Sequence, residues 1–271
     1  MNIIWGLLLA FQFLTRIPIP ISCPWNRDTM RWALRSYALV GLCLGAIVAA
    51  IVYILSPWLP LWMLALLTVT LWVALTGGLH LDGWADTADA VGSYAPLDKK
   101  WEIMKDPRIG VAGAIALLFL LLWKIALVYA YLDQFKGITW NTLLPFIWIP
   151  ALTRWGSLLL LAALPSVKSS GLAYEWKKHM KGRDLITAFL PIVLFVEAWG
   201  FLSSGVLADL SGAMLLILWL VIAYAFFILL FWLWVRRSFK AVNGDLAGAA
   251  IEGGELWLLC SLWIFMLFVM E

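Results

Sequence analysis

Three aspartates, Asp82, Asp86 and Asp89, follow one another at spacings of four and three residues. On a helix these spacings place the three carboxylates on one face, with neighbouring Cβ atoms about 5–6 Å apart. Three negative charges so close repel one another, and the repulsion grows where water is scarce. Carboxylate oxygens favour Mg²⁺, Mn²⁺ or Ca²⁺ over zinc, and Mg²⁺ fills its remaining positions with water and substrate phosphates. The pattern therefore predicts a metal–phosphate site, with room for two ions.

The residues just before these aspartates help to decide between two interpretations. The alternative to a metal–phosphate site is a solvated acidic start of a helix, where the helix dipole favours Asp. Gly77 and Gly78 argue against it, because two glycines allow a bulky ligand or a second helix to approach closely. His80 stands between the glycines and the aspartates, where it is either a base or phosphate donor or a structural hydrogen-bonding group.

Two further stretches contain residues suited to phosphate and metal binding. Lys105 and Arg108 precede a predicted helix, and the free N–H groups of a helix N-terminus attract anions, so we expect phosphate to bind there. Residues 243–252 are rich in glycine and include Asp245 and Glu252. We expect this acidic stretch to complete the metal site from a distant part of the chain.

The elements that position these residues must lie in lipid. Of the 271 residues, 64% are hydrophobic and 13% are charged, whereas a soluble domain has about a quarter charged residues. The 19 Trp agree with this, since Trp favours the membrane–water interface. A bilayer core of about 30 Å requires roughly 20 apolar residues per helix. Seven runs approach that length: 33–55, 58–77, 111–132, 145–164, 187–208, 212–235 and 256–270, the last one short.

The chain is therefore predicted to be all-α, a polytopic transmembrane bundle of about seven spanning helices that forms one domain over residues 1–271. Residues 1–14 are too short to span and are followed by Pro18 and Pro20, so they are expected to form an interfacial or re-entrant helix. The cysteines Cys23, Cys43 and Cys260 show neither disulfide nor metal spacing and are interpreted as reduced.

The basic residues alternate between the two sides of this bundle. The segments 15–35, 78–110, 165–186 and 236–255 hold four, four, five and three Lys or Arg, whereas 133–144 holds only Lys136. Because positive loops stay in the cytoplasm, the polar loops are predicted to be cytoplasmic and Glu271 to lie outside.

Three charges remain inside predicted spans: Lys124, Arg154 and Glu197. Charged residues within a membrane are costly and are usually functional or paired. Arg154 and Glu197 both lie near the middle of their helices, so these two are the candidate pair.

Three motifs resemble the cobalamin synthase family over nearly the whole chain and in the same order. They are Phe13-Leu14-Thr15-Arg16-Ile17-Pro18, Gly77 to Asp89 and Met104 to Gly110. The stretch around Gly244-Asp245 and Glu252 is similar to the C-terminal motif of that family. Pro107 and Asn243 depart from the pattern, and neither departure removes a carboxylate.

The resemblance implies a Mg²⁺-dependent transferase of the bacterial inner membrane with its active site facing the cytoplasm. The implied reaction is the last step of nucleotide-loop assembly, in which adenosylcobinamide-GDP and α-ribazole, or its 5′-phosphate, give adenosylcobalamin, or its 5′-phosphate, and GMP. The expected partners are these substrates and the lipid bilayer; no nucleic acid is expected, and a homo-oligomer is left open.

The candidate residues fall into three groups. The catalytic candidates are Asp82, Asp86 and His80. The metal ligands are Asp82, Asp86, Asp89 and Asp245. The substrate-binding candidates are Arg16, Lys105, Asp106, Arg108, Arg154, Asn243, Asp245 and Glu252.

Two rival functions differ in testable ways. A lipid phosphotransferase of the CDP-alcohol type shares the spaced aspartates and the metal chemistry, although the Asp-Gly…Ala-Arg spacing of that family is missing. A cation or substrate transporter would need a carboxylate near the bilayer midplane, and only Glu197 is predicted there. The first rival is distinguished by its substrates, and the second by the position of the carboxylates.

Overall fold

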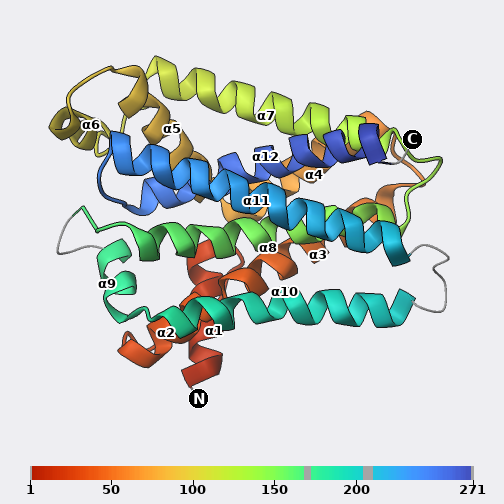
Figure 1. Cartoon of the computed structure of the whole chain (residues 1–271), viewed down its shortest axis with the longest axis horizontal. Helices are drawn as coiled ribbons and strands as arrows, with labels where there is room; N and C mark the ends of the chain where they lie inside the picture. The colour runs from red at the N-terminus through yellow and green to blue at the C-terminus, as the bar shows by residue number, and fades with distance from the viewer. Residues whose placement is uncertain (1, 168–171, 204–209, 270–271) are drawn as a thin grey trace.

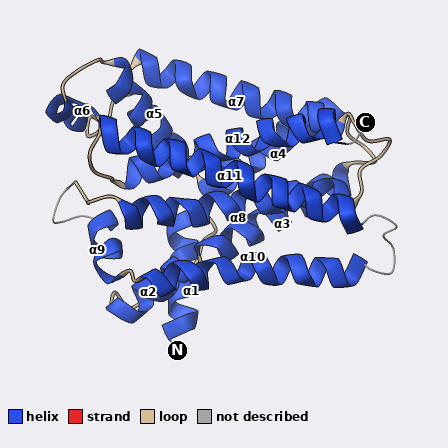
Figure 2. Ribbon diagram, viewed as in Figure 1, coloured by secondary structure: helices blue, strands red, loops and turns tan. Residues whose placement is uncertain are grey.

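The computed structural model describes residues 2–167, 172–203 and 210–269. Within these residues the secondary structure is helical, apart from one isolated bridge between Ser166 and Val242 (Figure 2). The helices are α1 (Asn2–Leu14), α2 (Arg27–Arg35), α3 (Tyr37–Leu55), α4 (Leu61–Thr76), α5 (Leu79–Gly92), α6 (Leu97–Ile103), α7 (Val111–Leu132), α8 (Trp140–Ala163), α9 (Leu172–His179), α10 (Gly182–Ser203), α11 (Leu210–Ser238) and α12 (Gly244–Val269). The predicted all-α bundle is confirmed.

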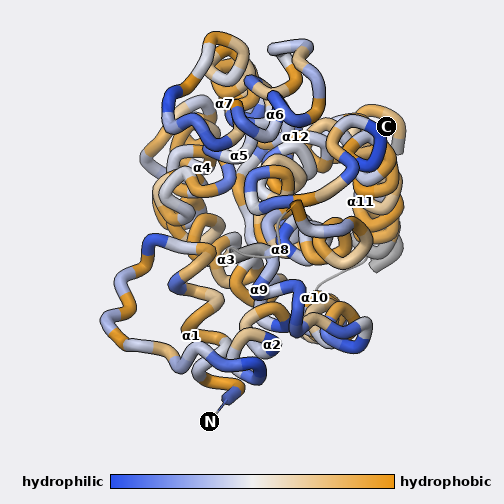
Figure 3. The backbone as a smooth tube through the Cα atoms, turned by 90° about the vertical axis from the view of Figure 1, so that its left-hand side faces the viewer, coloured by the Kyte–Doolittle hydropathy of each residue, from blue (hydrophilic) through white to orange (hydrophobic). Residues whose placement is uncertain are grey.

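The long helices α3, α7, α8, α10, α11 and α12 run along the long axis of the molecule, and α6 and α9 lie at one end (Figure 1). Seen from that end, hydrophilic stretches gather in the connecting loops and in the short helices (Figure 3). Among the candidate spans, α8 is the most enclosed, with 78% of its apolar window buried. Helix α8 is therefore the centre of the bundle.

Within the described residues, five helices are long and apolar enough to cross a membrane, and a sixth span results if α4 and α5 count as one bent pair. The five segments are Tyr37–Leu55, Val111–Leu132, Trp140–Ala163, Leu215–Ser238 and Gly244–Phe268. The chain is thus a multi-pass membrane protein, and the expected number of about seven is approximate. The predicted span 187–208 corresponds to α10 as far as Ser203, and its end lies outside the described residues, as does Glu271.

The last span differs most from its prediction. A short helix over 256–270 was expected after a cytoplasmic loop, whereas α12 begins at Gly244 and is helical through Glu252 and Glu255. The predicted start was too late because the continuous apolar run begins only after Glu255. The side chains of both glutamates are buried and ion-paired, which makes them compatible with a membrane helix.

The N-terminal segment forms the expected short helix, α1, which has 13 residues. Its apolar residues Leu9, Ala10 and Leu14 are buried in the same cluster as residues of α2 and α8. The helix therefore packs on the bundle near α2 (Figure 1).

Candidate functional site

A sharp bend between α4 and α5 places the aspartates of α5 at the end of the bundle. The two helices meet at 93°. Gly77 and Gly78 form the bend with φ angles of 65° and 74°, a left-handed conformation that residues with a Cβ rarely adopt. Arg16 donates its backbone N–H to the Leu75 carbonyl at 2.7 Å, and its side chain lies against Gly77. In this structure Arg16, a predicted substrate-binding residue, braces the bend.

A cavity of ≈ 510 Å³ opens beside α5. Its polar lining comes from three separate parts of the chain: Asp82 and Asp86 of α5, Lys105 and Asp106 of the loop between α6 and α7, and Asp245 of α12. The structure therefore brings together five of the residues singled out in the sequence, including the distant Asp245.

Asp245 reaches this cavity because α12 begins directly against α5. A Cβ atom built on Gly83 would lie 2.5 Å from the backbone oxygen of Asp245, so only glycine permits this approach. Asn243 accepts the backbone N–H of Leu246 at 3.0 Å and donates its amide to the Asp245 carboxylate at 2.6 Å. Asn243 thus caps the helix and orients Asp245.

The carboxylates of the cavity are electrostatically unbalanced. The charges of Asp82, Asp245 and Asp89 all act on Asp86, and Asp82 also acts on Asp245. Among the described residues, no Lys or Arg lies within ion-pair distance of Asp82, Asp86 or Asp245. An added cation would relieve this repulsion.

The donor set fits a hard ion with an incomplete protein shell. Within the described ranges, no three His, Cys, Asp or Glu side chains converge closely enough to enclose a metal ion. Mg²⁺ needs no such cage, because it commonly binds one or two carboxylates and completes its octahedron with water and substrate phosphates. Asp82, Asp86 and Asp245 line the cavity and are the carboxylates from which one or two such ligands would come.

Asp89 is placed differently from the other aspartates. Its two carboxylate oxygens accept the backbone N–H groups of Gly110 at 2.7 Å and Gly113 at 2.8 Å, at the N-terminus of α7. It is not among the residues that line the cavity. The three aspartates do share one helix, but Asp89 joins α5 to α7. Its predicted role as a metal ligand therefore competes with two hydrogen bonds.

The loop between α6 and α7 carries the predicted phosphate-binding residues. Lys105 lines the cavity, whereas Arg108 is 85% exposed and pairs with Asp106 at 2.6 Å. Hydrogen bonds from the side chain and backbone of Arg108 lower the pKa of Asp106 to about 2, so this carboxylate stays ionised at neutral pH. Lys105 is the better placed of the two basic residues.

His80 is 4% exposed and lies outside the cavity lining, so it does not face the carboxylates as a surface base would. A Cβ on Gly248 of α12 would lie 3.2 Å from the His80 Cα, which shows that α12 covers this turn of α5. The His80 Nδ1 atom has no hydrogen-bond partner among the described residues.

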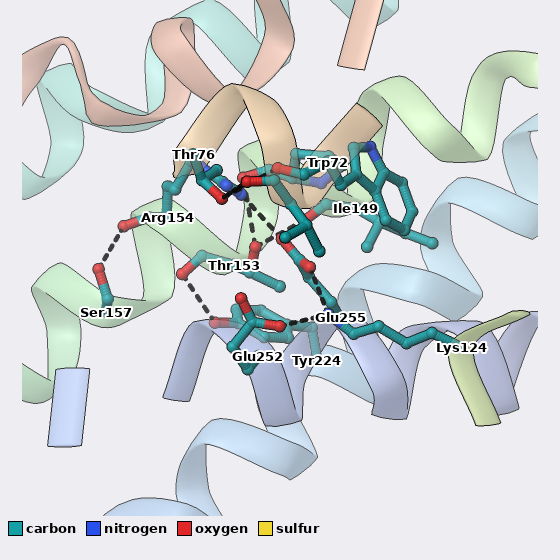
Figure 4. Close-up of polar contacts among 12 residues, drawn as sticks. Trp72, Thr76, Lys124, Ile149, Thr153, Arg154, Ser157, Tyr224, Glu252 and Glu255 are labelled. Carbon is teal, nitrogen blue, oxygen red and sulfur yellow. Dashed lines mark hydrogen bonds and ion pairs between the residues drawn. The ribbon is translucent and has the colours of Figure 1, made fainter. Parts of the chain in front are cut away.

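Two of the three predicted intramembrane charges, Lys124 and Arg154, belong to a buried network that is shown in Figure 4. The Lys124 Nζ of α7 contacts Glu252 at 2.5 Å and Glu255 at 2.7 Å, and Arg154 NH1 of α8 contacts Glu255 at 2.9 Å. All four residues are at most 5% exposed. The expected pairing of Arg154 with Glu197 is wrong: Glu255 is the partner of Arg154, and Glu197 is exposed.

This network changes the interpretation of two residues and adds a third. Arg154 and Glu252, both predicted to bind substrate, have protein partners and do not line the cavity. Glu255 was not singled out in the sequence. The sequence did contain a pattern that points to Glu255. Glu252 and Glu255 are three residues apart on one helix face, and their two negative charges balance those of Lys124 and Arg154.

Comparison with known proteins adds an independent observation. A family model described as cobalamin-5-phosphate synthase matches residues 6–263. A protein of Halalkalibacterium halodurans named adenosylcobinamide-GDP ribazoletransferase is 35% identical over 266 residues, covering 97% of each chain. Proteins of the same name from Geobacillus thermodenitrificans and Pseudomonas aeruginosa are 36% and 35% identical, covering at least 95% of each chain. No solved structure matches the chain.

Proposed function

The chain belongs to the cobalamin-5-phosphate synthase family, and we propose that it joins adenosylcobinamide-GDP to α-ribazole or α-ribazole 5′-phosphate. Family membership makes it a transferase of cobalamin biosynthesis that acts in the final step of nucleotide-loop assembly. The products of the proposed reaction are adenosylcobalamin, or its 5′-phosphate, and GMP.

The proposed reaction is a phosphoryl displacement. A ribose hydroxyl oxygen of the ribazole forms a bond to the phosphorus attached to cobinamide. The bond between this phosphorus and the bridging oxygen of the pyrophosphate breaks, and that oxygen leaves with GMP. The hydroxyl proton passes to a carboxylate, for which Asp82 and Asp86 are the candidates because both line the cavity.

The residues of the cavity suit this chemistry. Asp82, Asp86 and Asp245 would hold Mg²⁺, which when bound would neutralise the phosphate oxygens of substrate and leaving group. Lys105, which also lines the cavity, would bind a phosphate of the GDP moiety. Catalysis by these residues is then mainly positioning and charge compensation.

We further propose that the protein resides in the bacterial inner membrane, with the cavity facing the cytoplasm. The support is the distribution of Lys and Arg, which are concentrated in the segments on the side of the cavity. A reporter fused at Lys136, in the poorly charged loop between α7 and α8, is expected to be periplasmic. A cytoplasmic reporter signal at Lys136 would reverse the proposed orientation.

The observation that carries the proposed function is the meeting of Asp82, Asp86, Asp245 and Lys105 in one cavity of a chain from this family. The test uses purified protein with adenosylcobinamide-GDP, α-ribazole and Mg²⁺, with corrinoid product and GMP measured by chromatography. We expect equal amounts of cobalamin and GMP to form. Absence of both products, from protein that is folded and monodisperse, would contradict the proposal.

The same preparation distinguishes the rival lipid phosphotransferase. Incubation with a CDP-linked lipid and an alcohol acceptor is expected to release no CMP above the level of a protein-free control. CMP release with no reaction of the corrinoid would instead favour the CDP-alcohol type of enzyme.

A further inference from the structure

The helix that brings Asp245 to the cavity is fixed at two levels. At its start α12 touches α5, where the backbone of Asp245 lies against Gly83. Seven and ten residues later, Glu252 and Glu255 bind Lys124 of α7 and Arg154 of α8. Two turns of helix, about 11 Å, separate Asp245 from Glu252. The buried charges are therefore too far along α12 to belong to the cavity itself.

Helices α5, α7 and α12 are each joined to the other two beside the cavity. Asp89 ties α5 to the N-terminus of α7. Lys124 ties α7 to α12 through two carboxylates, and Asp245 against Gly83 returns from α12 to α5. The axial position of α12 relative to α7 thus determines where the Asp245 carboxylate stands relative to Asp86.

The buried charges suit a role in setting this axial position. Apolar contacts are non-directional and can re-form in another register, whereas a displacement of one helical turn, about 5.4 Å, would separate every ion pair of the network. Each separated charge would remain buried without a partner, which is strongly unfavourable. The two cations and two anions balance one another, so the network needs no substrate or ion to complete it.

We propose that Lys124, Arg154, Glu252 and Glu255 form a register lock that positions Asp245 in the cavity. The four side chains act through the placement of α12 and do not touch substrate. Their link to catalysis rests on the proposed function, whereas their effect on the position of α12 does not.

The test combines a distance with a rate. Spin labels are attached at Leu118 of α7 and Ile264 of α12, both exposed on the bundle surface, in protein whose three native cysteines are replaced. The variant Lys124→Met leaves two buried glutamates facing one arginine. Lys124→Met/Glu252→Gln removes one charge of each sign and keeps the pair of Arg154 with Glu255. Lys136→Met is the matched control, since Lys136 lies in an exposed loop.

The register lock predicts a distinct result for each variant. Lys124→Met is expected to shift or broaden the distance distribution by several ångström, and to lower kcat about tenfold or more with both KM values within twofold. The double variant is expected to restore the distance distribution and most of kcat, because no uncompensated charge remains. Lys136→Met is expected to match the parent in both measurements.

Other outcomes overturn the proposal. A lost rate with an unchanged distance distribution would assign Lys124 a chemical role. A raised KM for the corrinoid with normal kcat would assign it a substrate contact. If Lys124→Met does not insert, the double variant decides: insertion with the parental distance supports the lock, and failure of both variants refutes it. The distance measurement needs no substrate, so its result is independent of whether the proposed reaction is correct.

Discussion

Gly83→Ala places a methyl group where α5 and α12 meet, and its effect can be worked out from the structure. The new Cβ would lie 2.5 Å from the Asp245 oxygen, 2.8 Å from its Cα and 3.0 Å from its carbonyl carbon. All three are backbone atoms, so no side-chain rotation relieves the clash. Ordinary van der Waals contact begins at 3.4 Å, so the first turn of α12 must move by about 0.9 Å.

The cost to stability and the cost to catalysis are expected to differ. Overpacking costs about 1–3 kcal/mol, and replacing a helical glycine with alanine returns about 1 kcal/mol through helix propensity. The protein should therefore still fold. A displacement of about 1 Å in a positioned catalytic group can lower the rate about a hundredfold. We therefore expect kcat to fall far more than the melting temperature.

Gly248→Ala is the matched control, because it adds the same methyl group to the same helix interface. Its Cβ would lie 3.2 Å from the His80 Cα and 3.3 Å from the His80 oxygen, which requires a movement of only about 0.2 Å. We expect a rate within a few-fold of the parent and unchanged or slightly raised stability.

The assay is GMP release at saturating substrate, together with thermal unfolding in the same detergent. A Gly83→Ala enzyme with the parental kcat would show that Asp245 need not be held where α12 now places it. A Gly248→Ala enzyme as impaired as Gly83→Ala would show that the depth of the clash does not decide the outcome. Either result would refute the reasoning.

Three further predictions concern the polar residues of the site. Asp82→Asn and Asp86→Asn should each lower turnover at least about a hundredfold, which corresponds to about 3–4 kcal/mol of transition-state stabilisation. Added Mg²⁺ should rescue part of this loss. Near-normal turnover at low Mg²⁺ would show that the metal site is misplaced. Asp89→Asn should lower the free energy of unfolding by about 1–3 kcal/mol, and added Mg²⁺ should not restore it, because one amide oxygen cannot replace two carboxylate oxygens that accept N–H groups. A defect that depends only on Mg²⁺ would instead identify Asp89 as a metal ligand. Lys105→Ala and Arg108→Ala should raise the KM for adenosylcobinamide-GDP more than that for α-ribazole, and equal increases would indicate a structural role.

The sequence was sufficient for features that depend on local spacing and composition. The apolar runs predicted the helices α3, α7, α8 and α11 to within a few residues. The aspartate spacing predicted that 82, 86 and 89 share one helix, as they do in α5. The sharp bend at Gly77 and Gly78 was harder to predict. Two glycines indicate that another group can approach closely, but they do not give the direction of the following helix.

Partners distant in the chain were harder to predict. The sequence pointed to Glu197 as the partner of Arg154, and only three-dimensional packing shows that the partner is Glu255. The start of α12 lies before its apolar run, in a stretch whose two glutamates are compatible with a membrane helix only because Lys124 pairs with them. Hydropathy treats each charge alone, whereas the cost of a buried charge depends on its partner.

The position of the cavity also explains how several carboxylates can gather there without an ion-paired cation. Asp82 lies in the first turn of α5, Asp245 lies in the first turn of α12, and Asp89 binds the N-terminus of α7. Each helix N-terminus carries a partial positive charge of about +0.5, so three of them supply about +1.5. The helix ends thus offset only part of the negative charge of these carboxylates, and Asp86, on which the charges of Asp82 and Asp245 act, has no helix end of its own. A divalent cation would offset much of the charge that remains, and Lys105, which also lines the cavity, supplies one further positive charge. The helix ends alone therefore leave a net negative charge at the cavity, which a divalent ion would offset.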